Sequence, residues 1–222
     1  MTHLTPEVEH AIRIPSGDIY LDGILTIPKK SCGLVLFAHG SGSSRLSIRN
    51  QYVAKALNQV GLATLLFDLL TPDEDSIDKY TREFRFDIAL LAERLLDGTR
   101  WCLKQRSIAH LPLGYFGAST GGGAALVAAS QTAKIVRAVV SRGGRPDMAG
   151  NALTHVEAPS LFIVGGNDEV VCRLNQEALE KMHCIKQLEI IPGATHLFEE
   201  PGTLDEVARL AATWFVKYLA KS

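Results

Sequence analysis

The sequence predicts an α/β fold with a mostly parallel sheet of about eight strands and helices on both faces. Gly33–Ala38 is a continuous apolar run, which is typical of a strand covered on both faces. From there to the end, apolar runs of strand length alternate with segments whose apolar residues recur at helical spacing. This alternation favours parallel strands joined by crossover helices. Only the first two strands, Val8–Ile14 and Ile19–Ile27, are close enough to form an antiparallel hairpin.

The remaining elements follow in order along the chain. Further strands are predicted at 63–67, 111–116, 136–140, 159–164 and 187–191, and helices at 48–60, 88–103, 123–129, 171–183 and 203–220. Residues 71–85 are predicted to be a polar loop that forms a solvated rim. The connection 141–159 is too short for a lid domain, so we expect an open pocket without one.

Length and composition indicate an ordinary globular protein. The 222 residues suit a single domain, 1–222, and the formal net charge of −1 gives no basic surface for nucleic acid. We expect no membrane span, because no apolar run approaches the roughly 20 residues that one needs. The N-terminus lacks the pattern of a signal peptide, and the four cysteines lack metal-ligand spacing. These features predict a cytoplasmic protein; the oligomeric state stays open.

Residues 117–121, Gly-Ala-Ser-Thr-Gly, lie between a predicted strand and a helix of small residues. A serine at the apex of such a turn, here Ser119, projects clear of the backbone, and Gly117 and Gly121 allow the chain to pack closely. This order of strand, tight turn and helix resembles the nucleophile elbow of α/β-hydrolases. The five-residue pattern alone would also suit a glycine-rich turn with an inert serine.

A serine nucleophile needs a histidine base and an acid that orients the histidine, and in this fold they follow the serine in the order acid, histidine. Asp168 comes directly after the predicted strand 159–164, and His196 comes after the last strand. Both are therefore expected at the carboxyl edge of the sheet, where such sites gather. Asp147 is the rival acid. The alternatives are that Asp168 only caps a helix and that His196 is an ordinary loop histidine.

The oxyanion of a tetrahedral intermediate needs two hydrogen-bond donors. The backbone N–H of Thr120, at the start of the elbow helix, is one candidate. The loop after the first parallel strand, residues 39–44, supplies the other, and we assign it to the N–H of Ser41 ahead of that of Gly42. His39 in the same loop is expected to brace it.

Four motifs together resemble the dienelactone-hydrolase-like branch of the α/β-hydrolases, from about residue 19 to the C-terminus. The motifs are residues 36–40, 117–121, 166–168 and 193–196. The resemblance implies a triad of Ser119, Asp168 and His196. Dienelactone hydrolases proper carry cysteine at the elbow, so Ser119 favours a serine esterase. Related domains also occur fused to phosphoribosyltransferases; we expect this chain to hold only the hydrolase domain.

Arginines lie near both sides of the predicted site. Arg45 and Arg49 follow the oxyanion loop, and Arg142 and Arg145 follow a predicted strand. Arg45, Arg142 and Arg145 are candidates for binding a substrate carboxylate, because a guanidinium can pair with one through two hydrogen bonds. The alternative is that they form surface ion pairs.

The sequence therefore predicts a serine hydrolase that cleaves a small carboxylic ester, thioester or lactone through an acyl-enzyme, with no metal or organic cofactor. Two other functions remain open: a non-catalytic binding module, and lyase or perhydrolase chemistry on the same fold.

Overall fold

The computed structural model describes residues 4–220, so the predicted domain limits extend beyond the described residues at both ends. The strands are Glu9–Ser16 (β1), Ile19–Thr26 (β2), Gly33–Ala38 (β3), Leu62–Phe67 (β4), Leu113–Ala118 (β5), Val136–Arg142 (β6), Ser160–Gly165 (β7) and Lys186–Ile191 (β8). The α-helices are Ile48–Gln59 (α1), Pro72–Thr81 (α2), Ile88–Leu103 (α3), Thr120–Ser130 (α4), Glu169–Lys181 (α5) and Thr203–Leu219 (α6).

All eight strands form one sheet in the order β1-β2-β4-β3-β5-β6-β7-β8. The pairs β1–β2 and β2–β4 are antiparallel, and every other neighbouring pair is parallel. The predicted mostly parallel sheet and its opening antiparallel hairpin are therefore confirmed. The carboxyl ends of β3, β5, β6 and β7 consequently meet at one edge of the sheet.

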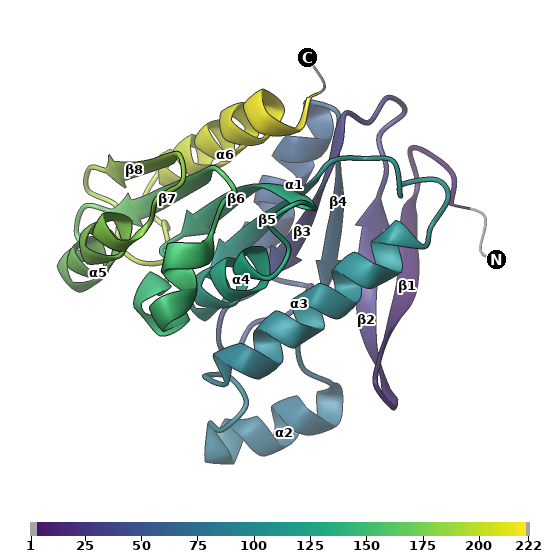
Figure 1. The fold of residues 1–222 in the computed structure, drawn as a ribbon, viewed down its shortest axis with the longest axis horizontal. Coiled ribbons are helices and arrows are strands. Elements are labelled where there is room, and N and C mark those ends of the chain that lie inside the picture. Colours follow the sequence, from purple (N-terminus) through teal and green to yellow (C-terminus); the bar gives the residue numbers. More distant parts are fainter. Residues whose placement is uncertain (1–3, 221–222) are drawn as a thin grey trace.

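Two apolar cores lie on opposite faces of the sheet. Helices α3 and α4 pack on one face, and α1 and α6 pack together on the other (Figure 1). The central strands β3, β4 and β5 are buried along their whole length, as the continuous apolar runs predict. The centre of the sheet is thus covered on both sides.

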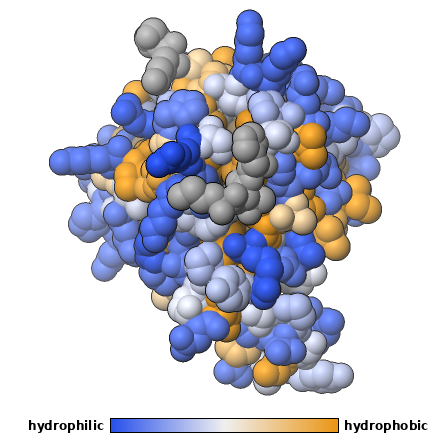
Figure 2. Space-filling model, turned by 90° about the vertical axis from the view of Figure 1, so that its right-hand side faces the viewer, coloured by the Kyte–Doolittle hydropathy of each residue, from blue (hydrophilic) through white to orange (hydrophobic). Residues whose placement is uncertain are grey.

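The antiparallel end of the sheet is more open. Buried residues alternate with exposed ones in β1 and with partly buried ones in β2, so each strand buries one face only. Figure 2 shows this side of the molecule as mostly hydrophilic, with apolar side chains scattered in small groups.

The structure corrects the prediction for residues 71–85, because most of this segment is the helix α2. Thr71 caps the helix: its hydroxyl accepts from the Glu74 N–H, and the Glu74 carboxylate accepts from the Thr71 N–H. Nor are all of its charges solvated. Asp78 is buried, and Glu74 pairs with the buried Arg94. In Figure 1, α2 lies apart from the two helix layers, beside the start of α3.

The connection between β6 and β7 holds only a kinked 3₁₀ helix, Pro146–His155. Short as predicted, it leaves the carboxyl edge of the sheet without a lid domain. Within residues 4–220, no helix is long and apolar enough to cross a membrane.

The turn between β5 and α4 packs tightly onto the end of β3. A Cβ atom on Gly121 would lie 2.1 Å from the Ala38 carbonyl oxygen and 2.6 Å from that of His39. One on Gly117 would lie 2.4 Å from the Gly121 carbonyl oxygen. Both contacts are with backbone, which cannot swing aside as a side chain can. The sequence needs glycine here because two strands and a helix meet at this turn.

We expect Gly121→Ala to destabilise the fold by at least about 3 kcal/mol, because the new methyl group overlaps backbone atoms. For a chain of this size, thermal unfolding would then fall by at least about 6 °C, which calorimetry measures. Gly202→Ala is the matched control. Gly202 has φ of 80° and open space around it, so only backbone strain of about 1–2 kcal/mol is expected. If Gly121→Ala and Gly202→Ala lost the same stability, the close contact of Gly121 with the backbone of β3 would be contradicted.

Candidate active site

Ser119 lies between the last residue of β5 and the first of α4, with φ of 52° and ψ of −122°. A non-glycine residue rarely adopts such a conformation, and the surrounding structure has to hold it. Three backbone hydrogen bonds do so: the Ser119 N–H donates to the Arg142 carbonyl, and the Ser119 carbonyl accepts from the N–H groups of Gly122 and Arg145. The side chain therefore stands out from the turn, as the elbow pattern predicts.

The structure brings Ser119, His196 and Asp168 into one hydrogen-bonded chain. The distance from His196 Nε2 to Ser119 Oγ is 3.3 Å, and that from His196 Nδ1 to Asp168 Oδ2 is 2.6 Å. A carboxylate only accepts, so Nδ1 carries the proton and Nε2 is free to accept from the serine hydroxyl. This is the tautomer that a general base needs.

The two carboxylates that could compete with Asp168 do not contact the histidine. Asp147 is held by Arg145, whose Nε and Nη2 lie 2.9 and 2.7 Å from its carboxylate oxygens. Glu169 is the first residue of α5 and makes no side-chain hydrogen bond within the described residues. Asp168 precedes α5 but its side chain does not cap the helix, so its carboxylate is available to His196.

The two predicted oxyanion donors lie at the same end of the sheet. Thr120 begins α4, so its N–H has no acceptor within the helix. Ser41 lies on the β3–α1 loop, and its side chain reaches Thr120, with 3.1 Å between the two hydroxyl oxygens. The neighbouring Gly40 packs on the elbow: a Cβ there would lie 3.1 Å from both the Ala118 carbonyl oxygen and the Ser119 Cβ. The loop and the elbow are therefore in direct contact.

His39 is buried behind this loop and braces it. Its Nδ1 lies 3.0 Å from the Gly40 carbonyl oxygen, and its Nε2 accepts from the Leu69 N–H at 2.9 Å. Burial lowers the pKa of His39, although its bond to the Gly40 carbonyl and the charge of Asp68 act in the opposite direction. The ring is therefore held neutral, with its proton on Nδ1.

The three candidate arginines lie in different surroundings. Arg45 forms an ion pair with Asp68, and Arg145 pairs with Asp147. Neither of them lines the cavity that contains Ser119. Arg142 does line it, together with Arg49, which pairs with Glu199 at 3.2 Å. The structure thus places only one of the three candidates, Arg142, in the cavity that contains Ser119.

Arg142 is a buried cation with no carboxylate partner among the described residues. It is 6% exposed, its Nη2 donates to Asn50 Oδ1 at 3.3 Å, and its Nε has no hydrogen-bond partner in the described structure. Its guanidinium carbon lies 5.8 Å from the centre of the Phe198 ring. Burial, with a smaller contribution from the charge of Arg49, lowers the pKa of Arg142 to about 10. The group therefore stays charged at neutral pH while lacking a counter-ion.

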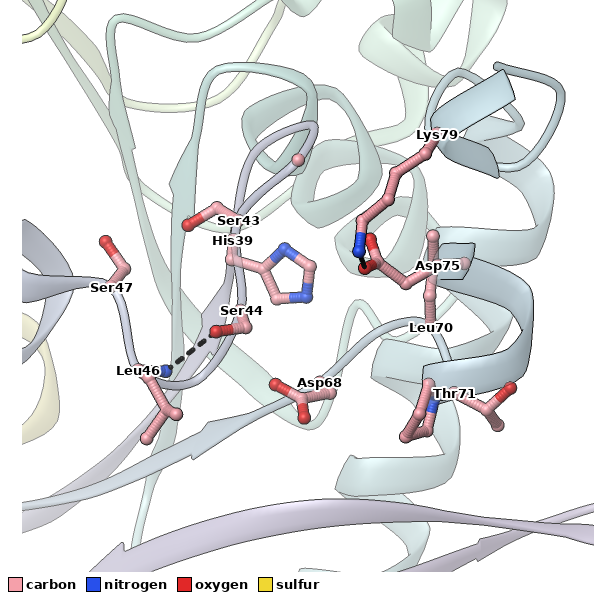
Figure 3. Close-up of a pocket in the computed structure, with 12 residues that line it drawn as sticks. His39, Ser43, Ser44, Leu46, Ser47, Asp68, Leu70, Thr71, Asp75 and Lys79 are labelled. Atoms are coloured by element: carbon pink, nitrogen blue, oxygen red, sulfur yellow. Dashed lines mark hydrogen bonds and ion pairs between the residues drawn. The ribbon is translucent and has the colours of Figure 1, made fainter. Parts of the chain in front are cut away.

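The cavity around Ser119 has a volume of about 190 Å³ and is lined by Ser119 and His196 among other residues. A larger cavity of about 550 Å³ lies beside the same loop, between residues 42–47 and the segment from Asp68 to Lys79. Figure 3 shows this larger cavity, with His39 directed into it and Asp75 paired with Lys79. Ser119, Asp168 and His196 are all absent from its lining, so we place the candidate active site in the smaller cavity.

Sequence reasoning missed some residues of the site. Asn50, in the first turn of α1, lines the cavity and carries the hydrogen bond to Arg142. No motif in the sequence marks it. By contrast, the helix α2 did have a signal, since Thr71-x-x-Glu74 with a proline after the threonine is a capping box.

Comparison with known proteins agrees with this architecture. The family model described as the dienelactone hydrolase family matches residues 21–218. A crystal structure of a dienelactone hydrolase from Anabaena variabilis is 58% identical, covers 96% of this chain and 98% of its own, and has a TM-score of 0.94. An α/β serine hydrolase without a lid from Xanthomonas campestris is 20% identical over the whole of both chains, with a TM-score of 0.78, which shows the fold alone.

Curated relatives from two strains of Mycobacterium tuberculosis are 56% identical over 214 residues. Both are named "Putative phosphoribosyl transferase". The match covers 96% of this chain but 47% of each relative, so the chain spans about half the length of these curated relatives.

The fold is that of an α/β-hydrolase with no lid domain. The chain belongs to the dienelactone hydrolase family.

We expect Arg142→Met to raise the stability of the protein, because it removes a buried charge that lacks a partner. A gain of about 1 kcal/mol corresponds to a rise of about 2–4 °C in the unfolding temperature. Arg145→Met is the control, since its ion pair is partly exposed and should change stability by less than about 1 kcal/mol. A marked loss of stability in Arg142→Met would contradict this expectation, because it would mean that the guanidinium has stabilising partners besides Asn50.

Proposed function

We propose that the protein is a serine hydrolase that cleaves a small carboxylic ester, thioester or lactone. The observation that carries the proposal is the hydrogen-bonded chain from Ser119 through His196 to Asp168, open to a cavity on the nucleophile's side. Membership of a hydrolase family adds support. Since that family covers almost the whole chain, we propose hydrolysis for it rather than the phosphoribosyl transfer named for the longer relatives.

In the proposed reaction, the Ser119 oxygen attacks the carbonyl carbon of the substrate while His196 Nε2 takes the hydroxyl proton. The N–H groups of Thr120 and Ser41 stabilise the oxyanion that forms. His196 then gives the proton to the leaving alcohol or thiol, which leaves an acyl-enzyme on Ser119. A water molecule, deprotonated by the same histidine, releases the acid and restores the serine. Asp168 orients the ring and stabilises its cationic form.

The size of the cavity favours short substrates. A volume of about 190 Å³ is below the roughly 300–1,000 Å³ of typical ligand pockets. Without a lid, no long apolar surface covers the elbow. We therefore propose a small-molecule substrate and, on the sequence features alone, a cytoplasmic location.

We further propose that Arg142, assisted by Arg49, binds an anionic group on the acyl part of the substrate. Arg142 is buried in the same cavity as Ser119, and its charge has no protein counter-ion within the described residues. A substrate carboxylate would provide one through charge-assisted hydrogen bonds. Arg45 and Arg145 are already paired with Asp68 and Asp147, so the proposed anion site does not include them.

Two alternatives differ in what they need from Ser119. A binding module would need no reactive serine, whereas lyase or perhydrolase chemistry would keep a reactive site without ester turnover. A fluorophosphonate probe and a panel of p-nitrophenyl esters separate them. Labelling with turnover supports hydrolysis, and labelling without turnover favours the other chemistries. If the protein shows no labelling and no turnover, the binding module is favoured.

Ser119→Ala should abolish labelling and lower kcat by at least about 10³-fold, because the triad acts as a unit. Asp168→Asn should lower kcat by about 10⁴-fold while the protein stays folded, since the amide favours the wrong histidine tautomer. Asp147→Asn is the matched control and should keep nearly full activity. If Asp147→Asn is the inactive variant instead, the acid of the triad has been misassigned.

Arg142→Met should raise KM about tenfold or more for esters with a carboxylate on the acyl group, such as a succinate half-ester, and change KM little for acetate. Arg145→Met should affect neither substrate. Activity should also fall as the acyl chain of p-nitrophenyl esters lengthens beyond a few carbons. Equal losses on acidic and neutral esters would contradict the anion site, and an optimum at long chains would contradict the small pocket.

A further inference from the structure

The two proposed oxyanion donors come from segments that are far apart in the sequence. Ser41 belongs to the β3–α1 loop and Thr120 to the start of α4, 79 residues later. Donors help only when both point at the place where the oxyanion forms, and a misplacement of about 1 Å can cost about 100-fold in rate. The distance between these two segments therefore has to be fixed by something other than the chain connectivity.

The side chains of the same two residues provide such a link. Ser41 Oγ lies 3.1 Å from Thr120 Oγ1 and 3.3 Å from the Arg85 carbonyl oxygen. A carbonyl oxygen can only accept, so the single hydroxyl proton of Ser41 goes to Arg85. The Thr120 hydroxyl must then donate to Ser41. The result is a directed chain of two hydrogen bonds from Thr120 through Ser41 to Arg85.

The far end of this chain is fixed by Asp78 of α2, which is 1% exposed. Its Oδ1 accepts from the N–H groups of Phe84 and Arg85 at 2.8 and 3.0 Å, and its Oδ2 accepts from Arg85 Nε at 2.5 Å. Arg85 Nη2 also donates to the Asp78 carbonyl at 2.9 Å. Asp78 thus fixes Arg85 of the α2–α3 connection to α2, and the carbonyl of Arg85 accepts the hydrogen bond from the Ser41 hydroxyl.

The charge state of Asp78 agrees with this role. Burial by itself would raise the pKa of the carboxyl, but the hydrogen bonds from Arg85 and Phe84 outweigh it, so the pKa of Asp78 is lowered. The group is ionised at neutral pH and accepts all three hydrogen bonds.

We propose that the hydroxyl chain Thr120–Ser41–Arg85, fastened at its end by Asp78, positions the two backbone donors of the oxyanion hole. This inference rests on the proposed hydrolase function. The Ser41 and Thr120 hydroxyls and Asp78 touch no reacting atom in this scheme, so they are positioning groups. The helix α2 and its connection to α3 serve as an external brace of the active site.

The test uses Thr120→Val and Ser41→Ala, which remove a hydroxyl but keep the backbone N–H. Each should lower kcat about tenfold, less than the 10²–10³-fold typical of deleting a donor, with KM unchanged within about twofold. The double variant should lose little more than either single variant, because the chain is already broken. Asp78→Asn should lower kcat by about threefold or more in the same manner.

A transition-state analogue separates positioning from a general loss of stability. The inhibition constant of butylboronic acid, which forms a tetrahedral adduct with a serine, should rise by the same factor as kcat/KM falls. Ser76→Ala is the matched control, because its exposed hydroxyl on α2 bonds only to the Pro72 carbonyl within the described structure. That variant should match the original protein in kcat and in inhibition.

Three outcomes would overturn the proposal: unchanged kcat in Ser41→Ala and Thr120→Val, fully multiplicative losses in the double variant, or losses that appear in KM alone. Circular dichroism checks that each variant is folded. If Asp78→Asn does not fold, the comparison of Ser41→Ala, Thr120→Val and their double variant still tests the proposal. Ser119→Ala, run in parallel, keeps the two proposals apart. If Ser119→Ala keeps turnover, the serine-hydrolase proposal is refuted. If Ser119→Ala loses turnover but the losses of Ser41→Ala and Thr120→Val multiply in the double variant, only the positioning role of the hydroxyl chain is refuted.

Discussion

The close packing of the β5–α4 turn on the end of β3 is the constraint on which the candidate site depends. Gly121 lies against the carbonyl groups of Ala38 and His39, and Gly40 lies against the elbow from the other side. Because the two chains approach so closely, the loop after β3 begins beside Ser119. The same contact leaves Ser119 in a backbone conformation that non-glycine residues rarely adopt. Three backbone hydrogen bonds hold Ser119 in this conformation.

The charges of the site are arranged unevenly. Asp168 has a partner in His196, and Arg45, Arg49 and Arg145 each have a carboxylate partner. Among the described residues, Arg142 has only an amide and an aromatic ring as partners. A folded protein gains nothing in stability from a buried cation without a counter-ion. The cavity beside Ser119 therefore contains a buried positive charge that no carboxylate of the described residues neutralises, which is why we propose an anionic group on the substrate.

Much of the fold and part of the site could be predicted from the sequence. Continuous apolar runs identified the central strands, and the positions of Ser119, Asp168 and His196 after three of the predicted strands indicated that they lie at one edge of the sheet. The sequence could not predict that Arg142, and not Arg45 or Arg145, would line the cavity around Ser119 without a carboxylate partner. This difference depends on Asp68 and Asp147, which neutralise the other two, and on burial at the end of β6. The helix α2 could have been found from its capping box, but the acidic composition of the segment suggested a solvated loop.

The buried imidazole of His39 makes the stability of the loop that carries Ser41 dependent on pH. Its Nε2 is an acceptor for the Leu69 N–H, and a protonated ring would turn that contact into two opposed donors. Burial lowers the pKa of His39 below the 6.5 of a free histidine, so the unfolded chain binds a proton more readily than the folded one. The contribution of this residue to stability is therefore complete above that value and decreases as the pH falls toward the folded pKa. The loop that carries Ser41 is therefore expected to become less stable in acid, and this effect comes from His39, which lies outside the hydrogen-bonded chain of Ser119, His196 and Asp168.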